Sequence, residues 1–287
     1  MHNPECAGRL KVLREPMYES FFALKQKPFT ITANPSFLYL SQRHKEALSY
    51  LSYGIKERVG FIEITGEVGT GKTTICRALL NQLDEKTKSA FIFNSNVSES
   101  QLMQSIIEDL GITTTRKGKG ALFAELNRFL IEQLTLNNNV VLLIDEAQNL
   151  TSRLLEQVRM LSNLEAENQK LIQIVLVGQP ELREKLRSPE LRQLRQRISV
   201  RYHITALTPT DVPLYIQHRL SMAGANGAGP TFNTEALEEI YKYSGGIPRL
   251  INIVCDKALL LAYVLENRTI TPDIIKQSII EIEGGIA

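Results

Sequence analysis

Short apolar runs alternate with segments of helical period between residues 61 and 204 of this chain. The runs, typical of strands covered on both faces, lie at 61–65, 90–93, 140–144, 171–177 and 198–204. Between them, apolar residues recur three and four positions apart, as in amphipathic helices, at 74–83, 99–110, 121–134 and 154–164. The polar, glycine-bearing stretch 113–120 is typical of a surface loop. This alternation predicts a parallel sheet with right-handed crossovers in a three-layer α/β domain.

The pattern changes near Leu207, after which helix signals take over. Thr208, Pro209 and Asp211 form a helix start, with a cap, a proline in the first turn and an acid three residues after the cap. Further helices are predicted at 234–243, 248–265 and 272–282, after a glycine-rich connector at 224–230. We therefore expect a disordered N-terminal extension at residues 1–17, an α/β domain at 18–207 and a small all-α domain of four helices at 208–287.

The composition is that of an ordinary globular protein, with 43% hydrophobic and 22% charged residues in 287. A net charge of +2 excludes wholesale attraction to nucleic acid or membranes, so any such contact must be a local patch. Cys6, Cys76 and Cys255 lack the spacing of a zinc site, and Cys76 is expected to be a small buried residue. No apolar run is long enough for a membrane span and no secretory signal is evident. We expect a soluble, cytoplasmic protein.

The segment GEVGTGKT, Gly66 to Thr73, lies between the first apolar run and the first helix. Its glycines let backbone amides converge on phosphate oxygens, Lys72 would reach the β and γ phosphates, and Thr73 would hold Mg²⁺. The helix that follows adds its positive end. The alternative is a plain glycine turn. The segment predicts nucleotide binding through Gly66, Glu67, Val68, Gly69, Thr70, Gly71, Lys72, Thr73 and Thr74.

Two acids follow the apolar run VVLLI, so Asp145 and Glu146 are expected at the carboxyl edge of the sheet, where ligands bind. Asp145 would hold the Mg²⁺ shell and Glu146 would polarise the attacking water. The alternative for this pair is a simple helix cap. Gln179, at the end of the next strand, is placed to bond either the γ-phosphate or the water. A polar turn residue is the competing interpretation of Gln179.

The segment 181–201 holds seven cations and three acids, a local excess of four positive charges. A solvated basic helix accounts for most of them. One arginine could instead reach the γ-phosphate of a neighbouring subunit; we favour Arg197, with Arg195 second. In the helical part, Arg249 lies in the first turn of a helix, where a cation opposes the helix dipole. A nucleotide phosphate is the expected reason for it, and a solvent-facing arginine is the alternative.

The motifs GEVGTGKTT, IDEAQNL, LVGQPEL, LRQLRQRI and GGIPRLIN, in this order, resemble the ATPase domain of the general secretion pathway protein A (ExeA-type) family within the AAA+ superfamily. The resemblance spans almost everything from Met17 onward. It implies a P-loop NTPase with an α/β/α parallel sheet, followed by a helical lid. The first and second motifs then correspond to Walker A and Walker B. The segment from Met17 onward is also similar to the family's amino-terminal segment, which packs near the adenine.

The resemblance also implies roles for single residues, some matching the expectations above. Gln179 departs from the asparagine or threonine commoner at sensor 1, although GQPEL is usual in this branch. At Tyr39 and His44, adenine contact and ordinary packing both remain open. The implied roles are Lys72 and Thr73 for phosphate and Mg²⁺, Asp145 and Glu146 as the strand acids, Gln179 as sensor 1, Arg249 as sensor 2, Arg197 as a finger acting in trans, and Asn94 as a restraint on the catalytic glutamate.

The function implied by the resemblance is a cytoplasmic, Mg-ATP-hydrolysing motor or switch that works as a homo-oligomer. Its expected partner is a membrane-associated secretion or exopolysaccharide export protein, which could recruit it to the inner membrane. Longer secretion members continue into a membrane span and a peptidoglycan-binding region, so only the ATPase part is expected here. One alternative is an ATP-dependent DNA-binding regulator of the transposition-ATPase type, with phosphate contacts from residues 183–201 and from Arg116, Lys117 and Lys119. Another is an ATP-binding scaffold with little turnover.

Overall fold

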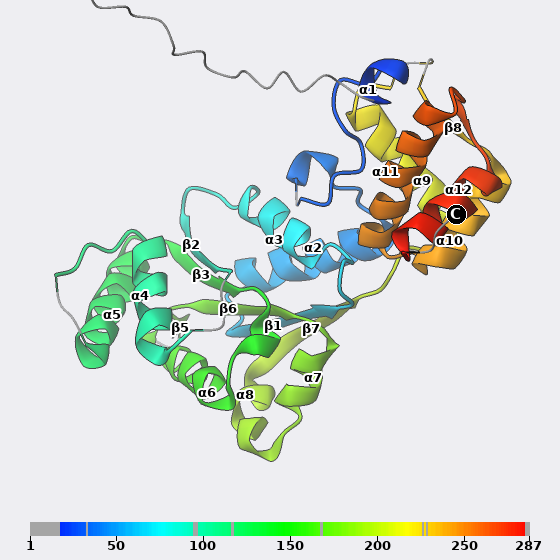
Figure 1. The fold of residues 1–287 in the computed structure, drawn as a ribbon. Helices are drawn as coiled ribbons and strands as arrows, with labels where there is room; N and C mark the ends of the chain where they lie inside the picture. The colour runs from blue at the N-terminus through cyan, green and yellow to red at the C-terminus, as the bar shows by residue number, and fades with distance from the viewer. Residues whose placement is uncertain are drawn as a thin grey trace, which may run out of the picture.

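The core of the protein is a five-stranded parallel sheet with the strand order β2-β3-β6-β1-β7 (Figure 1). The computed structural model describes residues 18–32, 34–93, 97–115, 118–166, 169–225, 227 and 229–284. The strands are β1 (Phe61–Gly66), β2 (Thr87–Ile92), β3 (Asn139–Ile144), β6 (Gln173–Gly178) and β7 (Ile198–Ile204). Strands β1 and β6 are buried along their whole length, because helices cover both faces of the sheet. The predicted α/β class is confirmed.

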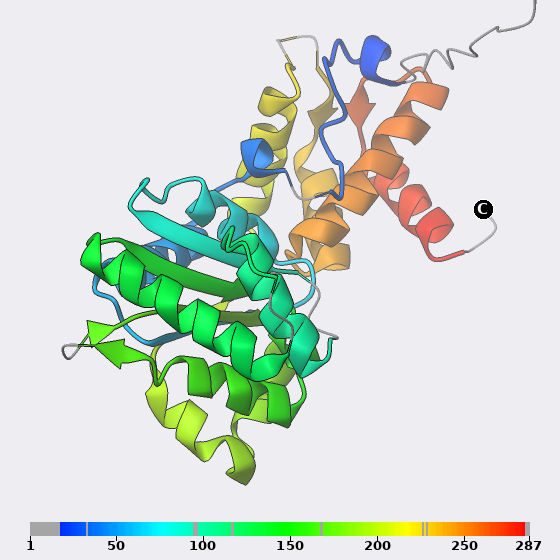
Figure 2. The same ribbon diagram turned by 90° about the vertical axis from the view of Figure 1, so that its left-hand side faces the viewer.

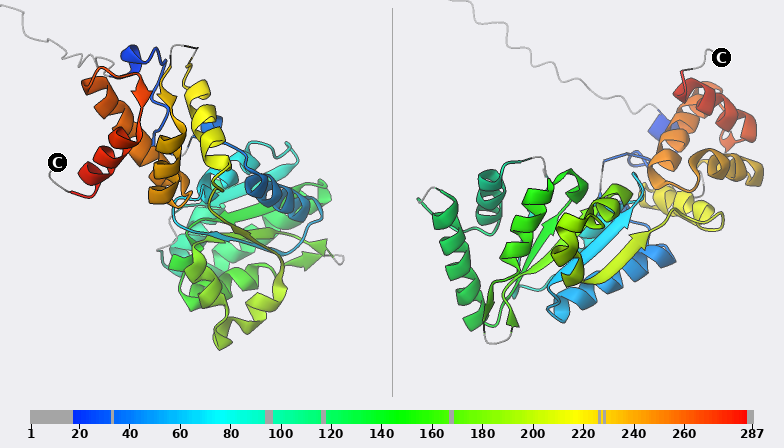
Figure 3. Two further views of the ribbon diagram at one scale, coloured as in Figure 1. Left: turned by 90° about the vertical axis from the view of Figure 1, so that its right-hand side faces the viewer. Right: turned by 90° about the horizontal axis from the view of Figure 1, so that it is seen from below.

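Helices lie on both faces of the sheet and complete the three layers (Figure 3). On one face α2 (Gln42–Lys56) and α3 (Lys72–Leu80) pack on Ile62 and Ile64 of β1. The opposite face packs against the remaining helices of this part, whose apolar sides share one cluster with Phe61, Leu142 and Leu176. These are α4 (Glu99–Asp109), α5 (Lys119–Thr135), α6 (Ser152–Leu161), α7 (Pro180–Leu186) and α8 (Arg192–Arg197). Cys76, on α3, is buried as expected.

Some elements of this part were not predicted from the sequence. Helix α2 is one, and a hairpin of β4 (Glu165–Ala166) and β5 (Gln169–Lys170) is another. Its strands are too short to carry a periodic pattern. The basic segment expected as a helix divides into α7, a 3₁₀ turn η3 (Pro189–Leu191) and α8, because Pro189 cannot continue the preceding helix.

Helices α9 to α12 form the helical part, close to their predicted positions. They are α9 (Asp211–Met222), α10 (Thr234–Ser244), α11 (Pro248–Val264) and α12 (Pro272–Ile282). Thr208 and Asp211 exchange the reciprocal hydrogen bonds of a capping box, although the helix itself begins at Asp211. The expectation of an all-α domain is wrong in one detail. Two short parallel strands, β8 (Thr231–Phe232) and β9 (Thr269–Ile270), join the loops before α10 and α12.

The segment from Tyr18 to Phe37 packs with the helical part of the chain (Figure 2). It contains α1 (Tyr18–Phe21) and the 3₁₀ turn η1 (Pro35–Phe37). Phe22, Phe29 and Phe37 are buried in the same cluster as the apolar faces of α9 and α11. The backbone amide of Lys25 donates to the carbonyl of Ala223. Residues 18–37, here called the N-terminal strap, therefore pack across the helical part. The domain division at Leu207 stays a proposal.

Several predictions fall outside the residues that the structure describes. These concern the extension at residues 1–17, the restraint by Asn94 and the DNA contacts of Arg116 and Lys117. Among the described helices, none has both the length and the apolar character needed to cross a membrane.

Candidate functional site

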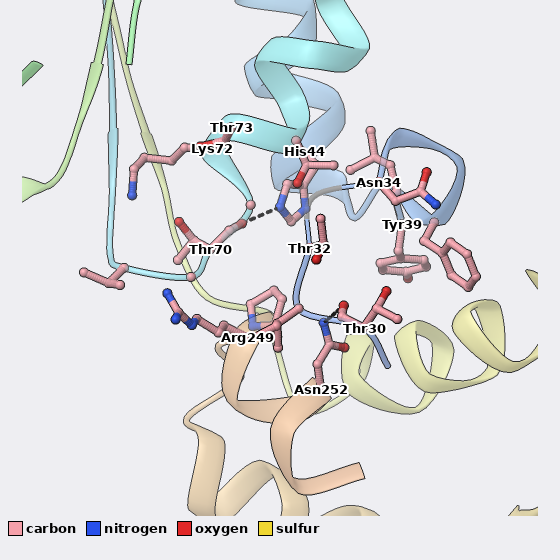
Figure 4. Close-up of a pocket in the computed structure, with 18 of the residues that line it drawn as sticks. Thr30, Thr32, Asn34, Tyr39, His44, Thr70, Lys72, Thr73, Arg249 and Asn252 are labelled. Atoms are coloured by element: carbon pink, nitrogen blue, oxygen red, sulfur yellow. Dashed lines mark hydrogen bonds between the residues drawn. The ribbon is translucent and has the colours of Figure 1, made fainter. Parts of the chain in front are cut away.

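A cavity of about 230 Å³ lies between the segment Gly66–Thr73, the N-terminal strap and helices α9 and α11 (Figure 4). Strand β1 delivers the segment to the carboxyl edge of the sheet, and α3 begins inside it at Lys72. The residues predicted for phosphate and metal binding line one side of the cavity, from Val68 to Thr74. Glu146, Gln179 and Arg249 line it as well.

The glycines of this loop are required by its shape. Gly69 and Gly71 have φ angles of +82° and +94°, in the left-handed region that side chains rarely adopt. A Cβ on Gly66 would lie 2.6 Å from the carbonyl oxygen of Ile204. The loop therefore curls tightly between β1 and α3, in the form expected of a phosphate cradle.

Lys72 is buried at the base of the loop, with 6% of its surface exposed. Its Nζ donates to the carbonyl oxygens of Gly66 at 2.7 Å and Glu67 at 2.9 Å. Burial lowers the pKa of Lys72, and the nearby Glu146 and Asp145 partly oppose this. The ammonium is thus held inside the concave side of the loop, where an anion would lie.

Thr73 and Asp145 join α3 to the end of β3. The hydroxyl of Thr73 donates to Oδ2 of Asp145 at 2.6 Å, and the amide of Glu146 donates to Oδ1 at 2.9 Å. Asp145 is 2% exposed, and this burial raises its pKa against the opposing effect of the Thr73 bond. Two oxygen ligands of the kind that Mg²⁺ prefers therefore lie together beside the loop.

Glu146 and Gln179 meet across the ends of β3 and β6. Nε2 of Gln179 donates to Oε2 of Glu146 at 3.0 Å. A third residue, Gln148, donates from its own Nε2 to the same oxygen. Gln148 lies in η2 (Ala147–Asn149), and sequence reasoning gave it no role. The sequence feature that could have pointed to Gln148 is its position in the motif IDEAQNL, two residues after Glu146.

The helical part touches the phosphate loop directly at Arg249. Its backbone amide donates to the carbonyl of Gly69 at 3.3 Å, and its side chain extends from α11 toward the loop (Figure 4). A Cβ on Gly69 would lie 2.6 Å from Cβ of Arg249, so only glycine permits this approach. Pro248 opens α11 and places Arg249 in its first turn. The predicted meeting of Arg249 with the nucleotide loop is thus compatible with the fold.

The other end of the cavity is built from the strap and from α9. Arg219, 7% exposed, donates from Nε to the carbonyl of Pro28 at 2.6 Å and from Nη2 to that of Thr30 at 3.0 Å. Its guanidinium lies 4.7 Å from the centre of the Phe37 ring. These contacts were missed because their partners are about 190 positions apart in the chain.

His44 and Tyr39, for which adenine contact and ordinary packing were both expected, have different surroundings. His44 is 3% exposed, and its Nε2 lies 3.0 Å from the carbonyl of Thr70 while Nδ1 lies 2.6 Å from the hydroxyl of Ser41. A carbonyl only accepts, so Nε2 carries a proton and donates it to Thr70. Burial lowers the pKa of His44. Both residues line the cavity, and the ring of Tyr39 packs 6.0 Å from that of Tyr215.

Comparisons with known proteins agree with this geometry. Residues 55–186 match the AAA domain family. Over 269 residues the chain is 44% identical to General secretion pathway protein A of Aeromonas hydrophila. Residues 55–186 are thus similar to AAA domains, and almost the whole chain is similar to part of that secretion protein. The resemblance predicted from the motifs is therefore confirmed. The alignment covers 93% of this chain but 49% of the secretion protein, so the chain spans about half of that relative's length.

Solved structures show the same fold at low sequence identity. The Aeropyrum pernix ORC2 protein, solved as ADPNP-ADP complexes, aligns with a TM-score of 0.67 and 17% identity over 90% of this chain and 72% of that one. The Drosophila ORC bound to DNA gives 0.70 and 18% over 98% and 70%. The Thermotoga maritima RuvB branch migration motor gives 0.57 and 19% over 85% and 70%. At these identities the likeness concerns the fold alone.

Arg197 is not among the residues that line the cavity. It ends α8, and the next residue, Ile198, pairs with Phe61 at the start of β1, whereas the phosphate loop follows the end of β1. Its Nη1 donates to the hydroxyl of Ser162 at 2.8 Å. Arg197 therefore lies at the amino ends of the strands, whereas the phosphate loop of the same chain lies at their carboxyl ends. Arg195 donates to the carbonyl of Arg187.

Proposed function

We propose that the protein binds Mg-ATP in this cavity and hydrolyses it. The observation that carries the proposal is the hydrogen-bonded pair Thr73 and Asp145, placed beside Lys72 and followed by Glu146. A phosphate cradle, a metal-binding pair of oxygens and a carboxylate near them are the parts that nucleotide hydrolysis requires. The AAA domain match supports the same reaction class.

The residues present fit a magnesium ion. The described residues hold no cluster of three or more His, Cys, Asp or Glu side chains of the kind that binds a metal alone. Mg²⁺ does not require such a cluster, since it keeps several waters and binds through one or two protein oxygens and the phosphates of its nucleotide. Thr73 and Asp145 would hold it. When bound, the ion would neutralise charge on the β and γ phosphates.

Each residue of the site then has a proposed role. The amides of the loop and the ammonium of Lys72 bind the phosphates, and Arg249 adds a cation from the helical part. Glu146 accepts a proton from the attacking water, and Gln179 orients the water or the γ-phosphate. The N-terminal strap and α9 line the other end of the cavity, where the adenine ring of the nucleotide would lie. Arg197 would reach the cavity of a second copy in a homo-oligomer.

The cellular role is inferred from the relative. The similarity to General secretion pathway protein A supports a role in secretion, and the partner that we propose is a protein of envelope secretion or exopolysaccharide export. We propose a cytoplasmic motor or switch that this membrane-associated partner recruits to the inner membrane. Purification of a hydrolysis-deficient Glu146→Gln protein with whatever it retains tests the partner.

Activity measurements test the reaction. We expect Mg-dependent ATP hydrolysis that falls by about 10²- to 10⁴-fold in Glu146→Gln with nucleotide binding retained. Lys72→Ala should abolish nucleotide binding. Lys242→Ala, which removes a mostly exposed ammonium on α10, is the matched control and should behave as the unmodified protein. A Glu146→Gln protein with an unchanged rate would exclude Glu146 as the base, and an ATP-binding protein without turnover would favour the scaffold alternative.

The alternative of a DNA-binding regulator rests on the basic segment 183–201 and on the loop that carries Arg116, Lys117 and Lys119. Several of its cations have partners inside the protein: Lys185 donates to the carbonyls of Gln148 and Leu150, and Arg201 pairs with Glu63. Lys119, from the second predicted DNA contact, pairs with Glu99. These contacts reduce the charge available to phosphates and favour the ATPase motor. ATP-dependent binding of labelled duplex DNA at moderate salt would reverse this preference.

A further inference from the structure

Three residues form a closed ring of hydrogen bonds at the carboxyl edge of the sheet. Nε2 of Gln148 donates to Oε2 of Glu146, the backbone amide of Gln179 donates to Oε1 of Gln148 at 3.1 Å, and Nε2 of Gln179 donates to Oε2 of Glu146 at 3.0 Å. The ring joins the end of β3, the turn η2 and the end of β6. It holds the carboxylate that the proposed function uses as a base.

The chemistry of the ring fixes which way the Gln148 amide points. A backbone N–H can only donate, so the atom of Gln148 that faces Gln179 must be its oxygen. The nitrogen then faces Glu146, and an amide nitrogen can only donate to the carboxylate. Two amide donors, one from η2 and one from the end of β6, thus hold the same oxygen of the Glu146 carboxylate.

The surroundings of Gln148 keep it in this position. A Cβ on Gly178 would lie 2.8 Å from Oε1 of Gln148, so the glycine before Gln179 leaves the space that the amide occupies. The Nζ of Lys185 donates to the backbone carbonyls of Gln148 and Leu150 and fixes the turn from α7. Glu146 has a φ of +50°, which turns the chain so that Gln148 can reach back to it.

Glu146 and Gln179 line the cavity, whereas Gln148 does not. Gln148 can therefore act on a bound nucleotide only through its two neighbours. We propose that Gln148 is a positioning residue for hydrolysis, which sets the orientation of the Glu146 carboxylate through this ring. The inference rests on the proposed ATP hydrolysis and adds a residue to it. Misplacing a catalytic group by about 1 Å can cost about 100-fold in rate.

Gln148→Glu is the sharpest test, because it keeps the size of the side chain and an acceptor for the Gln179 amide. It removes the donor to Glu146 and places two like charges together. We expect kcat to fall by about 10- to 100-fold, with the Kd for ATP changed by less than about threefold. Gln148→Met, which adds no charge, should show the same loss of kcat and covers the case in which the glutamate variant does not fold.

The control variant is Gln104→Glu. Gln104 donates to Glu108 at 2.9 Å on the exposed face of α4, so the substitution makes the same change of charge beside a carboxylate outside the site. Its kcat and Kd should equal those of the unmodified protein. The double variant Glu146→Gln with Gln148→Glu supplies a readout of the charge repulsion. In it only one of the two side chains is charged, so Tm should recover relative to Gln148→Glu while the rate stays as low as in Glu146→Gln alone.

The outcomes separate this inference from the proposed function. A Gln148→Glu protein with unchanged kcat, alongside an inactive Glu146→Gln protein, overturns the role of Gln148 and leaves the ATPase in place. Equal losses of kcat and of ATP affinity in both Gln148 variants overturn it as well, since they indicate a structural role. A protein that does not hydrolyse ATP, with or without Glu146→Gln, overturns the proposed function and this inference with it.

Discussion

The hydroxyl of Thr73 donates a 2.6 Å hydrogen bond to the carboxylate of Asp145, 72 residues along the chain. The bond links the first turn of α3 to the carboxyl end of β3 and brings two separate motifs into one site. Asp145 is almost completely buried, and this donor and the amide of Glu146 offset part of the desolvation of its charge. The pair therefore serves the fold and the proposed metal site together.

Thr73→Val should separate metal-dependent from metal-independent nucleotide binding. The valine keeps the shape of threonine but lacks the oxygen, so the affinity for ATP should fall at least about tenfold with Mg²⁺, or about 1.4 kcal/mol. The affinity without Mg²⁺ should change little. Thr135→Val, which removes an exposed hydroxyl bonded to the carbonyl of Glu132, is the control. Equal losses with and without Mg²⁺ would contradict the metal role. Titration of a labelled nucleotide provides the measurement.

Gly69→Ala should disrupt the contact between the phosphate loop and the helical part. Gly111→Ala is a matched control, because both glycines have positive φ but a Cβ on Gly111 meets nothing within 4 Å. Both variants should lose about 1 to 2 kcal/mol of stability from backbone strain. Only Gly69→Ala, whose Cβ would lie 2.6 Å from Cβ of Arg249, should also lose nucleotide affinity. Equal affinities in the two variants would show that the close approach is unimportant.

His44 should make the stability of the protein depend on pH. Burial lowers its pKa in the folded state below the ordinary 6.5, so the unfolded chain binds a proton first as the pH falls. Its contribution is therefore complete above pH 6.5 and is lost as the pH falls through the folded pKa. His44→Gln should flatten the fall in urea-unfolding free energy on acidification below pH 6.5. An unchanged slope would assign the dependence to other groups.

Arg219→Met should loosen the N-terminal strap. The substitution keeps an apolar stem but leaves the carbonyl of Pro28 without its buried donor, at a cost of about 1 to 3 kcal/mol. The carbonyl of Thr30 also loses its bond to Arg219 but keeps a donor in Nδ2 of Asn252. Arg43→Met is the control: its exposed pair with Glu46 should contribute less than about 1 kcal/mol. Trypsin cleavage near Lys25, followed by mass spectrometry, should become faster in Arg219→Met only. Equal rates in the two variants would mean that Arg219 does not hold the strap.

Local sequence patterns predicted the elements whose hydrophobic faces are long and regular. Strand β7 begins and ends where the apolar run does, and α12 matches its predicted bounds. The same reasoning placed Lys72, Thr73 and Asp145 near one another, because the carboxyl ends of parallel strands share an edge. The order of the motifs along the chain is thus enough to predict that the strand ends carrying them lie together.

Contacts between distant segments were not readable in this way. The strap at 18–37 has no periodic pattern, and its burial depends on helices that follow almost 200 residues later. In the sequence Arg219 looks like any other helix arginine, because its acceptors are two backbone carbonyls that only the folded structure brings to it. Gln148 follows a buried strand in a short polar turn, and its bonds depend on how the ends of β3 and β6 come together.

Mixing two inactive variants tests whether Arg197 acts in trans, because its position at the opposite end of the strands from the phosphate loop keeps it from the nucleotide of its own chain. Arg197→Ala keeps the base and lacks the finger, and Glu146→Gln has the reverse defect. In a one-to-one mixture of oligomers about one quarter of the interfaces combine an intact Glu146 with an intact Arg197, so about a quarter of the original rate should return while each variant alone stays inactive. Arg183→Ala, an exposed cation on α7, should be fully active by itself. A mixture as inactive as its components, under conditions where mixed oligomers form, would show that Arg197 is not the finger.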